Sequence, residues 1–370
     1  MRVTVFGTYD TAAHPRVGII AEGLAAHGFE VAECNVPLGL DTAARVAMLA
    51  QPWRVPLLLL RLASCWLRLA RGARRMPRPD VVLVGYLGHF DVRLARLLFR
   101  GTPIVLDHLI GASDTARDRQ VSGGVRQVLL RAIDSGALRS ADVIVVDTDE
   151  HLAALPDRHR GRGVVVPVGA PDTWFAAARS EAAEPEAAES APLRAIFFGL
   201  FTPLQGAPVI GAALAELGGE PIEVTMIGRG QDEAETKRLA AANGAVRWLD
   251  WVPSAELPAL VAAHDVCLGI FGTGPKALRV VPNKVFQGAA AGCAIVTSDT
   301  APQRRALGEA AVLVPPGDPA ALAAALRNLA GDREALAAGR KAAHQVALER
   351  FTPARVVESL VERLEKPEGD

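Results

Sequence analysis

Short apolar segments alternate with helical segments along this chain, and the alternation occurs in two series. The first series has six strand-like segments: Val3–Phe6, Phe29–Cys34, Val81–Gly85, Ile104–Leu106, Val143–Val146 and Val164–Pro167. The second series also has six: Ala195–Phe198, Ile222–Ile227, Val246–Leu249, Val266–Ile270, Ala294–Thr297 and Ala311–Val314. Continuous apolar runs separated by helices are typical of parallel sheets that are covered on both faces. We therefore predict an α/β protein with two Rossmann-like domains.

The composition changes between the two series. Residues 176–192 (AAARSEAAEPEAAESAP) contain alanine, glutamate and proline but no large apolar residue, which is typical of a linker. We predict an N-terminal domain over residues 1–175 and a second domain over 193–350. A last helix, Pro353–Leu364 within residues 351–370, begins after the N-cap Thr352 and can cross back to the first domain. Two such domains would enclose a cleft, the default ligand site of this architecture.

The charge balance argues against a nucleic-acid partner. The chain has 40 basic and 41 acidic residues and a formal net charge of -1, so no global basic field would attract nucleic acid. Four cysteines have neither zinc-site spacing nor a disulfide framework, which fits a reducing compartment. The N-terminus lacks a signal-peptide pattern, and no run is apolar and long enough to span a bilayer. We expect a cytoplasmic protein.

One segment, residues 55–78, is both amphipathic and basic. Its six arginines alternate with leucines and Trp66. This pattern resembles an interfacial helix that lies on an anionic membrane, which would place the protein peripherally on the inner face of the plasma membrane. A core helix with a solvated arginine face explains the same pattern, and the sequence favours neither.

The segment 263–298 has the pattern of an anion-binding site. A buried strand leads into a Gly-rich loop with Lys276 and Arg279, and a helix that opens near Asn283 carries Lys284. Strand, basic loop, helix N-terminus and strand is a common arrangement for holding a diphosphate. It favours a nucleotide-sugar or a similar anionic ligand.

A glycine turn, Gly199–Gly206, suggests a second phosphate contact. Glycines let the backbone approach phosphate, and the helix expected from about Ala207 directs free N–H groups at it. An ordinary tight connection between strand and helix is the alternative, because a lone glycine turn is weak evidence.

The order of these motifs resembles the retaining glycosyltransferases of the GT-B type, family 4 (glycosyl transferases group 1). The resemblance covers nearly the whole chain. It rests on FFGLFTPLQG (Phe197–Gly206), IGRGQ (Ile227–Gln231), GTYDTAAHPR (Gly7–Arg16), GHFDVRLARLL from Gly88, and the string from 263 to 299. That string matches a subgroup with a PNK-type element before the donor-site helix.

The resemblance implies roles for individual residues. Catalytic roles fall on His108, Lys284 and Arg279. Donor binding falls on Gly199, Thr202, Gln205, Gly206, Gly228, Gly230, Lys276, Val281, Asn283, Val285 and Gln287. The acceptor side takes Gly7, Thr8, Tyr9, Arg16, Asp107, Asp114 and Arg119. No metal and no cofactor is expected, the nucleotide-sugar being a co-substrate. His108 can equally be a loop residue, and Arg16 can simply begin a helix.

The chain departs from the family pattern at four donor-site positions. Leu200 and Gln205 stand where the family has an arginine and a lysine that hold the diphosphate, and Arg279 and Gln287 stand where it has paired glutamates. We expect rearranged donor chemistry, in which Lys276, Arg279 and Lys284 supply the positive charge.

The expected activity is transfer of a sugar, a hexose or a related one, from a nucleotide-sugar to an acceptor hydroxyl, with retention and without a metal. The acceptor is either lipid-linked or a small molecule. Two alternatives remain open. The four departures suit a nucleotide-sugar-binding pseudo-transferase or regulatory subunit without turnover, and the same scaffold also suits an epimerase.

Overall fold

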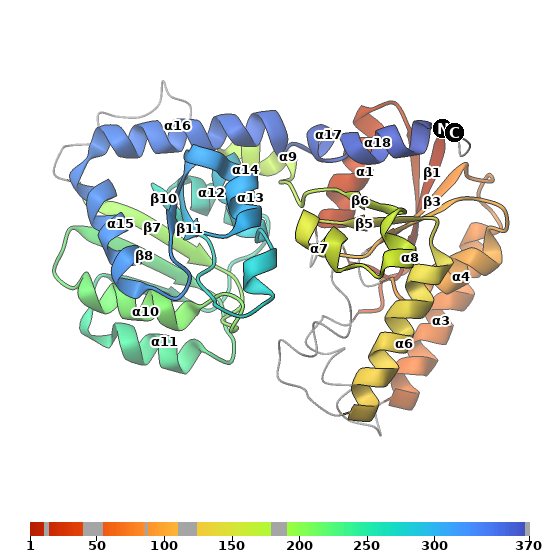
Figure 1. Cartoon of the computed structure of the whole chain (residues 1–370), viewed down its shortest axis with the longest axis horizontal. Coiled ribbons are helices and arrows are strands. Elements are labelled where there is room, and N and C mark those ends of the chain that lie inside the picture. Colours follow the sequence, from red (N-terminus) through yellow and green to blue (C-terminus); the bar gives the residue numbers. More distant parts are fainter. Residues whose placement is uncertain (11–14, 40–54, 86–87, 110–123, 179–190, 367–370) are drawn as a thin grey trace. The chain divides into compact units, whose positions relative to one another are not determined.

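The chain forms two compact units, each built on one sheet of six parallel strands (Figure 1). The computed structural model describes residues 1–10, 15–39, 55–85, 88–109, 124–178 and 191–366. The first unit comprises Met1–Pro167 and Val356–Asp370, and the second comprises Val168–Arg355. The predicted α/β class with two Rossmann-like domains is confirmed. Most of the predicted linker, at 179–190, lies outside the described residues.

The sheet of the first unit has the strand order β2-β1-β3-β4-β5-β6. Its strands are β1 (Arg2–Gly7), β2 (Glu30–Asn35), β3 (Val81–Val84), β4 (Ile104–Asp107), β5 (Val143–Val146) and β6 (Gly163–Val165). Its helices are α1 (Arg16–Ala26), α3 (Val55–Ala73), α4 (Asp91–Leu98), α6 (Gly124–Ser140), α7 (Asp149–Ala154), α8 (Asp157–Arg160) and α18 (Glu358–Glu365). Every predicted strand of this unit is present. Valine-rich runs favour strands of a sheet that is buried on both faces.

Alternate residues of each strand supply two separate hydrophobic cores. Val81 and Leu83 pack into one core with residues of α1 and α18. Val82 and Val84 point to the other face and pack with residues of α3, α4 and α6. This follows from the two-residue period of a strand, which turns successive side chains to opposite faces. The helices α3, α4 and α6 therefore form one layer on one face of the sheet.

The sheet of the second unit has the order β12-β11-β10-β7-β8-β9. Its strands are β7 (Leu193–Phe198), β8 (Ile222–Ile227), β9 (Val246–Leu249), β10 (Val266–Leu268), β11 (Ala294–Ser298) and β12 (Ala311–Val314). Its helices are α9 (Asp172–Ala177), α10 (Ala207–Glu216), α11 (Glu233–Leu239), α12 (Leu257–Ala262), α13 (Asn283–Ala290), α14 (Ala301–Leu307), α15 (Pro319–Gly331) and α16 (Arg333–Arg350). Short 3-10 turns lie at Ala240–Ala242, Ala277–Arg279 and Gly308–Ala310.

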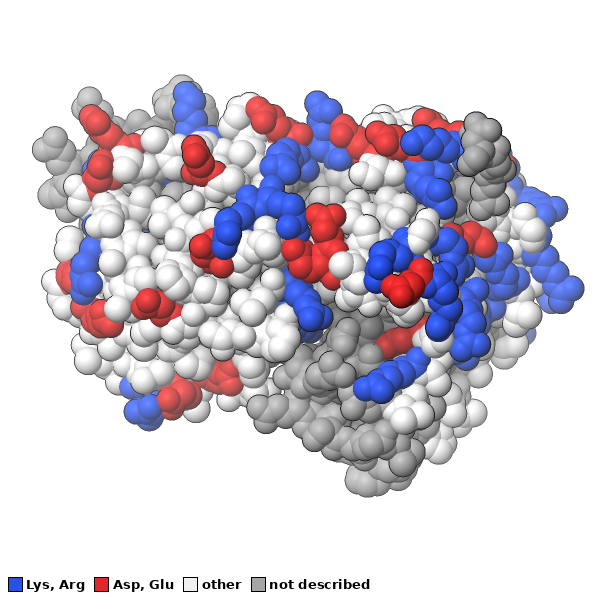
Figure 2. Space-filling model, viewed as in Figure 1, with Lys and Arg blue, Asp and Glu red and all other residues white. Residues whose placement is uncertain are grey.

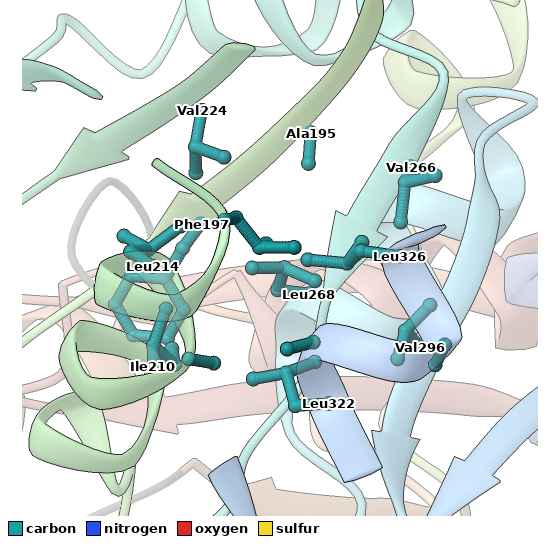
Figure 3. Packing of buried hydrophobic residues seen from close by; sticks show 14 of the residues in the cluster. Ala195, Phe197, Ile210, Leu214, Val224, Val266, Leu268, Val296, Leu322 and Leu326 are labelled. Carbon is teal, nitrogen blue, oxygen red and sulfur yellow. The ribbon is translucent and has the colours of Figure 1, made fainter. Parts of the chain in front are cut away.

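The main core of the second unit lies between its sheet and two helices. Figure 3 shows Ile210 and Leu214 of α10 and Leu322 and Leu326 of α15 pointing at the strands. Phe197 and the other strand residues of this cluster are almost completely inaccessible to solvent. This packing fixes the start of α10 relative to the end of β7.

Each sheet contains a point where the strand order reverses. In the first unit it lies between β1 and β3, and in the second it lies between β7 and β10. The carboxyl ends of the strands beside such a switch point leave a crevice, which is the usual ligand site of open α/β sheets. The predicted residues Gly7–Tyr9 and Gly199–Gly206 follow β1 and β7, so both segments lie at switch points.

The end of the chain differs from the prediction. A single helix over Pro353–Leu364 is expected, but α17 (Pro353–Val356) ends before Val357 and α18 begins at Glu358. The interruption coincides with the boundary at which the chain passes from the second unit to the first. Thr352 accepts a hydrogen bond from the backbone N–H of Arg355 at 3.4 Å, as its predicted role as N-cap requires.

Within the described residues, no helix is both long enough and apolar enough to cross a membrane.

Candidate functional site

The turn between β7 and α10 is held against the loop that follows β10. Gly206, the N-cap of α10, has a φ of 65°. A Cβ atom there would lie 2.4 Å from the backbone of Phe271 and Gly272, so only glycine fits. The backbone N–H of Phe271 donates to the carbonyl of Gln205 at 3.0 Å. The two loops at the switch point are thus in backbone contact.

The turn after β8 joins the same group of loops. The N–H of Gly199 donates to the carbonyl of Ile227, and the N–H of Phe201 donates to the carbonyl of Arg229, each at 3.0 Å. Gly228 and Gly230 lie in this turn, and Thr202, half-buried, lies in the turn after β7. Three predicted glycine positions are therefore brought together through backbone hydrogen bonds, which makes this edge of the sheet preorganised.

Two backbone amides are available to a ligand, one in the turn before α10 and one at the first residue of the helix. The backbone N–H groups of Leu204 and Ala207 donate to no described residue. Unpaired N–H groups at a helix N-terminus carry partial positive charge and attract anions. Gln205 stands between them with its side chain half-buried.

Lys284 is brought to this turn by the close packing of α13 on β10. A Cβ atom at Gly288 would lie 2.6 Å from the Cβ and Sγ atoms of Cys267, so glycine at this position allows the close approach. The thiol of Cys267 in turn donates to the carbonyl of Lys284 at 3.4 Å. Lys284 is the second residue of α13, and its side chain therefore reaches the carboxyl end of the neighbouring strand β7.

The ammonium group of Lys284 is buried, and none of the described acidic residues pairs with it. Lys284 is 4% exposed, and its Nζ atom lies 3.7 Å from the centre of the Phe197 ring. The same Nζ donates a hydrogen bond to Oε1 of Gln205, and it would lie 3.2 Å from a Cβ atom at Gly199. Among the described residues, no carboxylate forms an ion pair with it. An amide oxygen and an aromatic ring supply only part of the lost hydration.

Burial lowers the pKa of Lys284 from 10.5 to about 7. The cause is desolvation, which disfavours the charged form of a lysine. An anion placed beside Nζ would reverse this effect and raise the pKa again. A buried lysine with a perturbed pKa at a switch point is a strong candidate for a functional residue.

Gln287 lies on the same side of α13 as Lys284. Residues three positions apart are neighbours on a helix surface. Gln287 is 8% exposed, and its amide makes no hydrogen bond with a described residue. The structure therefore brings Gly199, Gln205 and Lys284 together, with Gln287 beside Lys284.

Other predicted residues around α13 are placed differently. Val281 and Val285 are buried, and Val285 packs against Gly269, so both contribute to the core. Asn283 is exposed as the first residue of α13. Arg279 is exposed and Lys276 is half-buried, and each has polar interactions of its own. Of these three predicted cations, Lys284 is the one that is buried at the turn.

At the switch point of the first unit, side chains of the unit form hydrogen bonds with one another. Oδ2 of Asp91 accepts hydrogen bonds from the backbone N–H of Thr8 at 2.8 Å and from its hydroxyl at 2.7 Å. Oδ1 accepts from Nε1 of Trp66 at 2.8 Å. Asp91 was not predicted as a site residue, although it lies within the GHFD motif and begins α4. Asp91 links β1, α3 and α4.

Tyr9 also faces inward. It is 4% exposed, and its hydroxyl donates to Oε1 of Glu33 at 2.6 Å. Burial raises the pKa of the Tyr9 phenol, which stays neutral. Its ring packs against Gly85, and Gly7 lies against Asp91 and Tyr9.

Arg16 and Asp107 form an internal ion pair in the first unit. Nε of Arg16 donates to Oδ1 of Asp107 at 2.9 Å, and Arg16 is 2% exposed. The two terminal nitrogens of Arg16 donate to the backbone carbonyls of Pro167 at 3.1 Å and Val166 at 2.9 Å. Each guanidinium nitrogen therefore has a partner inside the unit. The pair ties the start of α1 to β4 and to the end of the unit's first segment.

His108, which follows β4, has a ring nitrogen that forms no hydrogen bond with a described residue. Its Nδ1 atom is buried and has no hydrogen-bond partner among the described residues. Burial, with the nearby His89, lowers the pKa of His108 to about 3, so the imidazole is neutral at physiological pH. The rings of His89 and His108 lie 5.3 Å apart. A neutral imidazole with one unsatisfied nitrogen can exchange a hydrogen bond with a ligand.

Two predicted acceptor-side residues, Asp114 and Arg119, lie outside the described residues. In the part of the chain that the structure describes, no group of three or more histidine, cysteine or acidic residues is arranged to hold a metal ion.

Comparisons with known proteins agree with this architecture. Residues 192–332, within the second unit, match the family model described as Glycosyl transferases group 1. No curated protein matches the sequence. HepE of Anabaena, solved with UDP and glucose, is similar in structure, with a TM-score of 0.68, 15% identity, and coverage of 98% of this chain and 99% of HepE.

Two further solved structures are similar. Sucrose-phosphate synthase of Thermosynechococcus elongatus has a TM-score of 0.69 and 16% identity, with 98% of each chain covered. The UDP-forming trehalose-phosphate synthase of Burkholderia xenovorans has a TM-score of 0.59 and 15% identity, with 81% of this chain and 77% of that chain covered. These likenesses show the fold, which is the two-unit GT-B fold over nearly the whole chain.

Proposed function

We propose that this protein is a glycosyltransferase that moves a sugar from a nucleotide-sugar to an acceptor hydroxyl. The match of residues 192–332 to group 1 glycosyltransferases supports the reaction class. The GT-B neighbours include HepE, which has been solved with UDP-glucose. We therefore propose a uridine diphosphate sugar, a hexose or a related one, as the first donor to test.

The observation that carries the proposal is the buried ammonium of Lys284 at the glycine turn. It contacts Gln205, in the turn where the amides of Leu204 and Ala207 donate to no described residue, and it has no carboxylate partner among the described residues. This combination of amide groups and one desolvated cation suits a diphosphate, whose charge grows as the glycosidic bond breaks. The protein would supply charge stabilisation and positioning.

The pair of Gln205 and Lys284 explains how the site works without the usual lysine at position 205. Gln205 stands where the family has a lysine. The hydrogen bond from Nζ of Lys284 to Oε1 of Gln205 places the ammonium group of an α13 residue next to this position. We propose that Lys284 of α13 supplies the positive charge at the Gly199–Gly206 turn that the family's lysine at position 205 would supply. This is consistent with membership of family 4 and of the PNK-type subgroup, which we also propose.

Retention and independence from metal are part of the proposal. The resemblance favours a front-face route, in which the leaving phosphate takes the proton of the attacking hydroxyl. A cation within the site can neutralise the diphosphate, so we expect turnover to persist in EDTA. Gln287 would bond the ribose hydroxyls, and the first unit would present the acceptor through His108.

A thermal-shift screen of UDP, GDP, ADP and their sugars tests binding. We expect one nucleotide family to raise the melting temperature of the wild type and not of Lys284→Ala, because a ligand that binds only the folded state stabilises it. The anomeric configuration of the product, read by NMR, tests retention. Failure of every diphosphate to bind would refute the proposal.

A pseudo-transferase is the second candidate, because Leu200 is 52% exposed where the family pattern has a diphosphate-binding arginine. A measurement of slow donor hydrolysis distinguishes a pseudo-transferase from an active transferase. An active transferase should release free sugar from the donor without any acceptor, and a binding protein should not. Release of an isomerised nucleotide-sugar would instead indicate an epimerase.

A further inference from the structure

We propose that the outer face of α3, with the turn that follows it, docks the first unit onto an anionic lipid bilayer. The inference concerns the first unit, whereas Lys284 belongs to the second, and it does not depend on the reaction. It decides between the two interpretations of residues 55–78 that the sequence left open.

The two sides of α3 differ in burial. Leu62, Cys65 and Leu69 are 8%, 9% and 0% exposed, and they form the side that packs on the unit. Leu57, Leu60 and Leu67 are 51%, 69% and 59% exposed. These three follow one another at steps of three and seven residues, which places them on one side of a helix. The helix therefore has an inner apolar side and a separate outer leucine stripe.

Arginines flank the outer leucine stripe. Arg61, Arg68, Arg71, Arg74 and Arg75 are exposed, and none forms an ion pair with a described residue. No acidic residue occurs between 55 and 79. Arg61 lies four residues after Leu57 and Arg71 lies four residues after Leu67, so each is a neighbour of an exposed leucine on the helix surface. Figure 2 shows basic side chains gathered on this side of the first unit.

The neighbouring helices of the same layer add apolar surface. Leu97 of α4 is 64% exposed, and Val128 of α6 is 65% exposed. Both helices cover the same face of the sheet as α3. The layer formed by α3, α4 and α6 therefore exposes large apolar residues on each of its helices, which is typical of an interaction surface.

The chemistry of this face selects a bilayer over other partners. An anionic membrane offers a layer of phosphates above hydrocarbon, so arginines and leucines of one helix can be satisfied together. A nucleic acid would use the arginines but would leave the leucine stripe in water. An apolar protein groove would use the leucines and leave five guanidinium groups without partners. Charge and apolar surface on one helix side thus point to lipid.

Cosedimentation with vesicles tests the proposal on the full chain. Wild type should bind vesicles with about 30% phosphatidylglycerol and should not bind pure phosphatidylcholine. The double variant Arg74→Ala, Arg75→Ala should bind about 25-fold more weakly, at about fivefold for each arginine. The control Arg247→Ala, Arg363→Ala removes two exposed arginines elsewhere and should bind like wild type.

The leucine stripe is tested separately. Leu60→Ser with Leu67→Ser should bind anionic vesicles about a hundredfold more weakly and should be released completely by about 0.5 M NaCl, which screens the charges. Leu348→Ser, at a residue of α16 that is 44% exposed, is the matched control. Far-UV circular dichroism and melting temperature establish that each variant is folded.

Three results would overturn the proposal. Unchanged binding of the arginine variant would show that this face is not the docking surface, and equal binding to neutral vesicles would remove the electrostatic component. If the leucine variant bound like wild type at high salt, the stripe would not enter the bilayer. Displacement from anionic vesicles by single-stranded RNA at low micromolar concentration would identify a nucleic-acid face.

Discussion

Replacing Lys284 by methionine should stabilise the empty protein and abolish its response to a nucleoside diphosphate. The fold holds the pKa of Lys284 at about 7, against 10.5 for a lysine in water. This difference corresponds to about 5 kcal/mol that the folded state loses when the lysine is charged. Methionine is apolar and similar in length, so it removes the buried charge without leaving a large cavity.

The effect has a defined pH dependence. Because the folded-state pKa is lowered, the unfolded chain binds more protons between about pH 7 and 10.5, and stability rises with pH in that window. The cost of burying the charge is about 5 kcal/mol below pH 7, about 3 kcal/mol at pH 8 and about 1 kcal/mol at pH 9.5. The lost hydrogen bond to Gln205 and ring contact with Phe197 offset about 1–2 kcal/mol.

Differential scanning fluorimetry at two pH values measures the prediction. At pH 6.5 the melting temperature of Lys284→Met should exceed that of wild type by on the order of 5–10 °C, and at pH 9.5 the two should nearly coincide. Lys341→Met, on α16, is a lysine control that should follow wild type at both pH values. A variant that is no more stable at pH 6.5, or one whose advantage persists at pH 9.5, refutes the assignment of a buried unpaired charge.

Three further predictions concern the same structure. Binding of a nucleoside diphosphate at pH 8 should take up about 0.8 proton per site, and far less at pH 6, because the anion raises the pKa of Lys284. Calorimetry in buffers of different ionisation enthalpy measures the proton uptake. Equal uptake at both pH values would contradict the prediction. Arg16→Met should destabilise the first unit by about 3–5 kcal/mol in urea unfolding, because it leaves the carboxylate of Asp107 buried without its ion-pair partner. The double variant with Asp107→Leu should recover part of this lost stability, and no recovery would argue against the Arg16–Asp107 ion pair. Gly206→Ala should lower stability by about 2 kcal/mol or more in the same assay, since Cβ would meet the backbone of the β10 loop, while Gly244→Ala, with nothing within 4 Å, should change little.

Most of the strands were predictable because they are short runs of apolar residues. Val143–Val146 is completely buried, and it begins and ends at the predicted residues, as does the less buried Val246–Leu249. The final helix was predicted as one piece because its local pattern continues across Val357. The break follows from the passage of the chain between two units, which no local pattern records.

The site was predictable in part. The glycine turn and Lys284 follow from motif order, so the sequence places both near the carboxyl edge of the second sheet. Burial of the ammonium does not follow, since it depends on the close approach of α13 to Cys267. The inward orientation of Arg16 and Tyr9 depends on partners in distant strands. Asp91 was missed because its three hydrogen bonds come from β1 and α3, far away in the sequence.

The return of the chain's last segment to the first unit sets an order for synthesis. Val357, Leu360 and Val361 of this segment belong to the same core as Val3 and Val5 of the first strand. Domains fold as their residues leave the ribosome, so the first unit must wait, with part of its core exposed, until the final residues are made. The second unit is complete by Arg355 and can fold earlier, although it is encoded later. A premature stop shortly before Val357 would therefore leave a folded second unit attached to a first unit whose core lacks Val357, Leu360 and Val361.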